Sequence, residues 1–142
     1  MPISVISTGT PEVADEVGKL ADELLYAMGQ TFDLARFDLA KSDLIVLNVY
    51  AIAPHRGSIP DGISFKRADR EFWSSRNIDF LRYEGGDLAT KIDAVGMALI
   101  EAFEQVPRSR ASNDAKQAFR AAVSEAGMRL QAEPDRLTYR QR

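Results

Sequence analysis

The chain has 142 residues and a mass of 15.7 kDa, a size at which one domain buries roughly two thirds of the surface that its unfolded form exposes. Hydrophobic residues make up 45% and charged residues 27%, which are globular rather than disordered or fibrous proportions. The absence of cysteine excludes disulfide scaffolds, cysteine-ligated metal sites and thiol nucleophiles, and it fits a reducing compartment. The sequence has no secretory signal and no apolar run of membrane-spanning length, so we expect a cytoplasmic protein without a membrane partner.

The charged residues are distributed unevenly along the chain. The net charge is −3, but residues 1–62 hold 4 basic and 9 acidic side chains, whereas residues 63–142 hold 14 and 12. Binding to a phosphate backbone needs a basic surface, so we expect no nucleic-acid partner. The arginines after residue 107 are scattered without interleaved aromatic residues, which is typical of a solvated helix face.

A β-rich run over residues 3–6 is followed by the pattern of an amphipathic helix. Thr10 suits the N-cap, Pro11 the first helical position and Gly29 the C-terminal cap. Apolar residues recur between these ends at close to the 3.6-residue period, namely Val13, Val17, Leu20, Leu24 and Met28. The pattern predicts a helix from Thr10 to Gly29.

Residues 32–37 and 44–52 are rich in β-branched and aromatic side chains and are predicted to form strands. The second run is apolar at nearly every position, which favours a central strand covered on both faces. Asn48 interrupts it, and we expect a hydrogen bond from its side chain to neighbouring backbone. Residues 54–62 are dense in Pro and Gly and are predicted to form a surface loop.

Residues 63–68 and 70–83 have β propensity and period-two alternation, which predicts two antiparallel strands. Gly85 and Gly86 then supply a break, and Asp87 is placed as the N-cap of a helix over 88–106. A further helix is predicted over 113–132, where small alanines favour close packing.

The predicted order is β-α-β-β-β-β-α-α, without the strict alternation of a doubly wound parallel sheet. It therefore predicts an α+β fold in which three helices cover one face of a mainly antiparallel sheet of about five strands. No linker or repeat interrupts the pattern, so we expect a single domain over residues 1–134 and a C-terminal tail over 135–142.

The sequence offers little support for catalysis, a metal site or a cofactor. His55, the sole histidine, has no set of neighbouring ligands at metal-binding spacing, and no nucleophile elbow or phosphate-binding loop occurs. We therefore expect a protein that is not an enzyme. The alternative is a small enzyme or ligand-binding domain with its site around the 54–70 loop, built from His55, Asp61, Arg67 and Asp69.

The segment from Phe65 to Phe103 carries a resemblance to a known family. A basic and aromatic strand ending at Trp73 precedes Asn77-Ile-Asp-Phe80, then a Gly/Asp break and a helix that includes Ala98-Leu-Ile-Glu-Ala-Phe103. This arrangement resembles the immunity proteins of bacterial polymorphic toxin systems, in which a charged strand leads into a similar strand, an acidic turn and a helix rich in Leu, Ala and Ile. The resemblance covers about a quarter of the chain.

The resemblance implies a non-catalytic protein that binds a cognate toxin domain and neutralises it. Acidic side chains would complement the basic surface of a nuclease toxin, and Arg and Trp often anchor interfaces. The candidate contacts are Asp33, Asp38, Asp43, Asp61, Arg67, Arg70 and Trp73. Core or sheet-edge packing remains the alternative for Trp73, and ordinary solvation the alternative for the acids. Self-association through the alanine-rich helix or a strand edge is compatible with either function.

Overall fold

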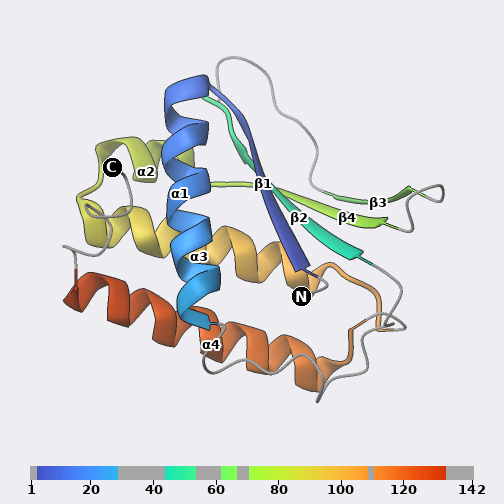
Figure 1. Ribbon diagram of the computed structural model, residues 1–142. Coiled ribbons are helices and arrows are strands. Elements are labelled where there is room, and N and C mark those ends of the chain that lie inside the picture. The colour runs from blue at the N-terminus through green and yellow to red at the C-terminus, as the bar shows by residue number, and fades with distance from the viewer. Residues whose placement is uncertain (1–2, 29–43, 54–61, 67–70, 109–110, 134–142) are drawn as a thin grey trace.

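The computed structural model of the chain describes residues 3–28, 44–53, 62–66, 71–108 and 111–133. Within these residues four strands and four helices are formed (Figure 1). In chain order they are β1 (Ile3–Gly9), α1 (Pro11–Met28), β2 (Leu44–Ala51), β3 (Gly62–Lys66), β4 (Glu71–Asn77), α2 (Phe80–Gly85), α3 (Leu88–Glu104) and α4 (Asn113–Ala132). The strand expected over 32–37 and most of the loop expected over 54–62 lie outside the described residues.

The described sheet has the order β1-β2-β4-β3, in which β1, β2 and β4 are parallel and β3 alone is antiparallel to its neighbour. The fold is α+β as predicted, but the mainly antiparallel sheet of about five strands and the three helices expected from the sequence are wrong. α1 crosses between β1 and β2, and such a crossover makes two adjacent strands parallel. The chain then passes through β3 at the outer edge before β4 enters beside β2, so β4 also runs parallel to β2 (Figure 1).

The expected strand over residues 70–83 is wrong in its second half. β4 ends at Asn77, and residues from Phe80 onward form the short helix α2. Asp79 caps this helix, because its Oδ1 accepts a hydrogen bond from the Arg82 amide at 3.3 Å. Phe80 and Tyr83 are both buried, and a spacing of three residues places them on one helical face. The period-two alternation of apolar residues over 70–83 therefore spans the end of β4 and the single turn of α2.

The helices cover one face of the described sheet in two layers (Figure 1). α1 packs on β1, α3 packs on β2 and β4, and α4 lies against both helices on the side away from the strands. Alternate residues of β2, among them Leu47 and Val49, are fully buried against this layer. The ring centroids of Phe103 and Phe119 are 4.3 Å apart, and this stacked pair joins α3 to α4.

The three long helices begin where the sequence predicts. α1 starts at Pro11, and Asp87 is confirmed as the N-cap of α3, since its side chain accepts from the Thr90 amide at 2.9 Å. Ser112 caps α4 by accepting from the Ala115 amide at 3.1 Å. Caps and apolar periodicity are local signals, which is why they locate helix ends well.

β2 is confirmed as a central strand, lying between β1 and β4. Asn48 is 3% exposed, and its Oδ1 accepts a hydrogen bond from the Thr8 hydroxyl of β1 at 3.2 Å, a side-chain contact between neighbouring strands. At the end of β1, Gly9 has a φ of 139°, and a Cβ there would lie 2.4 Å from the Ala51 carbonyl oxygen. Only glycine fits this close approach of β1 to β2.

Candidate functional site

Of the seven residues proposed from the sequence as toxin contacts, the structure describes Trp73. Trp73 lies in the middle of β4, half-buried, and its indole N–H donates to Glu71 Oε2 at 2.7 Å. Its neighbour Ser74 donates to the Ala102 carbonyl of α3, so alternation along the strand places Trp73 on the sheet face away from that helix. The other six lie outside the described residues, namely Asp33, Asp38, Asp43, Asp61, Arg67 and Arg70. His55 and Asp69 of the alternative site also lie outside them.

Acidic side chains gather instead on α1, on α2 and on the first turns of α3. The segments Pro11–Lys19 and Asp79–Asp93 hold seven acidic and three basic residues, a net charge of −4. We call this region, with the exposed apolar residues within it, the acidic helix surface. Its carboxylates, all exposed except the half-buried Glu16, are Glu12, Asp15, Glu16, Asp79, Glu84, Asp87 and Asp93.

Contacts around Glu16 join the two segments. Glu16 Oε1 accepts a hydrogen bond from the buried Tyr83 hydroxyl of α2. The same oxygen forms an ion pair with Lys91 Nζ of α3 at 2.9 Å. Lys91 Nζ also lies 5.2 Å from the centroid of the Tyr83 ring, within cation–π range. One carboxylate in the second turn of α1 therefore holds α2 and the first turn of α3 in place.

The same contacts shift the ionisation of the groups involved. The hydrogen bond from Tyr83, together with the nearby Lys91 charge, holds the pKa of Glu16 below its usual range. Burial, and then the adjacent Glu16 carboxylate, raise the pKa of Tyr83, so the phenol stays protonated and acts as a donor. Tyr83 is 2% exposed, which makes it a structural connection rather than a group that a ligand reaches.

Only part of the acidic charge is neutralised locally. Lys19 pairs with Asp15 at 3.1 Å, and Arg82 pairs with Asp93 at 2.6 Å. With Lys91 held by Glu16, all three basic side chains of the two segments are engaged. Among the described residues, no cation lies at ion-pair distance from the remaining four carboxylates, those of Glu12, Asp79, Glu84 and Asp87.

Two of these four carboxylates also serve as helix caps. The hydrogen bond from the Thr90 amide lowers the pKa of Asp87, so its carboxylate remains charged. Asp79 plays the same capping part for α2. Because the chain places acids at these caps, the negative charge of the surface is fixed close to the backbone instead of resting on long mobile side chains.

Apolar side chains lie exposed between the acids. Leu81 of α2 is 70% exposed and Leu88, the first residue of α3, is 39% exposed. A leucine this exposed buries little apolar area in the free protein. An apolar contact surrounded by charged residues is the usual anatomy of a protein-binding patch. Sequence reasoning missed this surface because residues 78–83 were expected to form a strand, which would have placed Leu81 differently.

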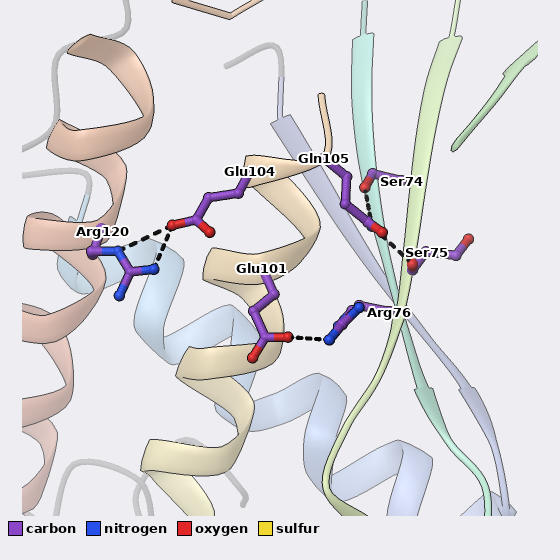
Figure 2. A network of polar contacts seen from close by, with 7 residues as sticks. All are labelled: Ser74, Ser75, Arg76, Glu101, Glu104, Gln105 and Arg120. Atoms are coloured by element: carbon purple, nitrogen blue, oxygen red, sulfur yellow. Dashed lines mark hydrogen bonds and ion pairs between the residues drawn. The ribbon is translucent and has the colours of Figure 1, made fainter. Parts of the chain in front are cut away.

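A second polar cluster, at the other end of α3, has a structural explanation (Figure 2). Arg76 of β4 pairs with Glu101 at 2.5 Å, and Gln105 Nε2 donates to Ser74 Oγ and to the Ser75 carbonyl, both at 3.0 Å. Figure 2 also shows Arg120 of α4 reaching Glu104 of α3, with Nε 3.1 Å from Oε1. These groups satisfy one another and fasten α3 to β4 and α4.

The described residues contain no group of three or more His, Cys, Asp or Glu that could hold a metal ion. Nor is any helix in the described ranges long and apolar enough to cross a membrane. Comparison with known proteins found no matching family model, no matching curated protein and no matching solved structure.

Proposed function

We propose that this chain is a non-catalytic binding protein, an immunity protein that binds a cognate bacterial toxin domain and blocks its activity. The resemblance of residues 65–103 motivates the family. The observation that carries the proposal is the acidic helix surface, where Leu81 is 70% exposed and four carboxylates have no cation at ion-pair distance among the described residues. A nuclease toxin binds a phosphate backbone and so presents a basic surface, which such a patch complements.

The separate parts of this surface would contribute differently. Charges at the rim of an interface mainly accelerate association, and their effect falls as the ionic strength rises. Leu81 would supply the apolar contact that slows dissociation, because its side chain loses contact with water only in the complex. A rigid patch also loses little entropy on binding, and Glu16, Tyr83 and Lys91 supply that rigidity.

The first test is whether a dedicated partner exists. The tagged protein is used for a pull-down from its native bacterium, and the neighbouring gene product is tested for co-purification and for toxicity that this chain relieves. One near-stoichiometric partner together with growth rescue is the expected result. Failure of both co-purification and rescue would overturn the proposal.

Matched variants then test the surface with the purified partner. Glu84→Gln and Gln117→Lys each raise the net charge by one, but Glu84 lies on the acidic helix surface and Gln117 is an exposed residue of α4. We expect Glu84→Gln to slow association several-fold at low salt and Gln117→Lys to have little effect. Leu81→Ala should weaken binding roughly tenfold, mainly through faster dissociation. Equal effects of the two charge variants would refute this placement of the interface.

A further inference from the structure

β1 forms one edge of the described sheet, because β2 pairs with it on one side and no described strand pairs with it on the other (Figure 1). The amide of Thr10, just after β1, donates to the Ala51 carbonyl of β2 at 3.0 Å. Alternate residues of a parallel strand direct their backbone groups to opposite sides, so the even-numbered residues of β1 bond to β2. The backbone groups of Ile3, Val5 and Ser7 therefore point outward from the sheet edge.

This edge lacks the features that usually prevent a strand from pairing further. Natural edge strands are kept short or are protected by charged side chains, by proline or by a bulge. β1 has seven residues, none of them charged and none a proline, and its register with β2 is unbroken from Ile3 to Gly9. Ser7 donates to the Ala14 carbonyl of α1, so alternation places Ile6 on the opposite face of the sheet, where it is 38% exposed.

A second copy of β1 fits this edge in antiparallel orientation. Ile6 is the central residue of the strand, so a two-fold axis beside it pairs all seven residues of each copy. Val5 of one copy then lies opposite Ser7 of the other, and both direct their backbone groups outward, so the two residues exchange hydrogen bonds. The two Ile6 side chains become a directly opposed apolar pair, and each covers the exposed surface of the other.

The face of the edge toward α1 has room for the second copy. An open hollow of about 280 Å³ lies between β1 and α1, and Ser7, Ala14 and Gly18 are among the small residues that line it. Even a Cβ at Gly18 would lie 3.7 Å from Ser7 Cβ, which is ordinary contact. In the two-fold arrangement, Val5 of the second copy lies opposite Ser7 on this face, at the mouth of the hollow. A small residue thus faces a larger one across the axis.

The charges beside the edge favour a copy of this chain over a strongly charged strand. β1 itself offers no charge with which such a strand could pair. The hollow is lined by charges of both signs on α1, those of Asp15, Lys19 and Asp22, and Lys19 pairs with Asp15 at 3.1 Å. A surface of a single sign would repel its own copy, whereas mixed signs let each copy present a cation and acids to the other.

We propose that two copies of this chain pair through β1 into a two-fold symmetric dimer in which one sheet continues from copy to copy. The outward backbone groups of Val5 and Ser7 form the new hydrogen bonds. Ile6 packs against its counterpart on one face, and Val5 packs beside the Ser7 hollow on the other. This assignment does not depend on the proposed immunity function.

Sedimentation equilibrium of the purified full chain measures the self-association. We expect a monomer–dimer equilibrium, and we expect Ile6→Lys to raise its dissociation constant roughly tenfold or more, because two like charges would lie directly opposite each other. Ser4→Lys is the matched control, since Ser4 lies on the same face but opposite Thr8 of the other copy, and its effect should be smaller. A parent chain that stays monomeric at the highest concentration reached, or equal effects of the two variants, would overturn the proposal.

Cross-linking tests the register independently, because the sequence has no cysteine and one introduced thiol per chain is a clean reporter. In Ile6→Cys the two Cα atoms would lie about 4.5 Å apart, as in a non-hydrogen-bonded antiparallel pair, which a disulfide can span. In Ser4→Cys they would lie roughly 14 Å apart, out of reach of a disulfide. We expect oxidised glutathione to convert Ile6→Cys, and not Ser4→Cys, into a covalent dimer. Cross-linking of both variants to the same extent, or of neither, contradicts the pairing through β1.

Discussion

Removal of a single hydroxyl, in Tyr83→Phe, tests whether Glu16 holds the acidic helix surface together. The variant keeps the buried ring and its cation–π contact with Lys91 but deletes the hydrogen bond to Glu16. A hydrogen bond to a charged group contributes about 1.5–3 kcal/mol, and the side chain of Glu16 is 43% exposed, so we discount this to about 1 kcal/mol. For a chain of this size that corresponds to a fall in melting temperature of roughly 3–5 °C.

The pH dependence of stability gives this prediction its sharper form. The pKa of Glu16 is lowered in the folded state from its ordinary value of 4.5, so the folded protein binds fewer protons than the unfolded chain. The resulting stabilisation is present above the unfolded pKa and is lost as the pH falls through the folded one. In Tyr83→Phe the folded pKa moves back toward the unfolded value, so the free energy of unfolding should depend less on pH below about pH 4.5.

Urea unfolding at neutral pH and across the acid range measures both effects. Glu16→Gln and the double variant complete a double-mutant cycle, and we expect the two single changes to be non-additive because they remove one shared contact. Additive free energies, or an acid dependence identical to that of the parent chain, would refute the role given to the Tyr83–Glu16 contact.

Three further variants test other contacts. Gly9→Ala combines a φ of 139° with a Cβ 2.4 Å from the Ala51 carbonyl oxygen, so it should destabilise the fold by at least about 1–3 kcal/mol in urea unfolding, and a neutral result would contradict the close approach of β1 to β2. Ser112→Ala should cost about 1 kcal/mol through loss of the α4 cap, whereas Ser112→Asp, which keeps an acceptor, should retain most of the stability; equal losses in calorimetry would argue against capping. Ser74→Ala removes a fully buried hydroxyl that bonds to Ala102 and Gln105, and it should lower the free energy of unfolding by about 1–3 kcal/mol. Ser75→Ala is the control and should lower it less. Hydrogen exchange that is faster in Ser75→Ala than in Ser74→Ala would contradict this expectation.

The sequence predicts the long helices well because their signals are local. Thr10 and Asp87 were predicted as caps ahead of apolar residues at helical spacing, and α1 and α3 begin at the residues that follow them. α2 was missed for the same reason. Its six residues are too few for a period to emerge, and the aromatic residues Phe80 and Tyr83 have β propensity that tertiary burial overrides.

Strand direction could not be predicted, because it depends on where the chain returns. The residues of β4 do not indicate that this strand lies beside β2 as well as beside β3. In the described sheet, only the antiparallel pairing of β3 with β4 joins strands that are close in sequence. The candidate contacts met a different difficulty. Most were acids and arginines that lie outside the described residues, whereas the acidic helix surface is assembled from residues more than 60 positions apart, as the contact between Glu16 and Tyr83 illustrates.

The wide separation of those residues makes the surface a reporter of complete folding. Glu16 belongs to the first helix of the chain, yet its partners follow β4, so an unfolded or half-made chain has the acids but not their arrangement. Any ligand that recognises the arrangement binds only the native state and stabilises it by mass action, by about 2.7 kcal/mol at a hundredfold excess over its dissociation constant. Such a ligand would therefore protect this chain from unfolding and from proteases, so the chain would last longer in the complex than alone.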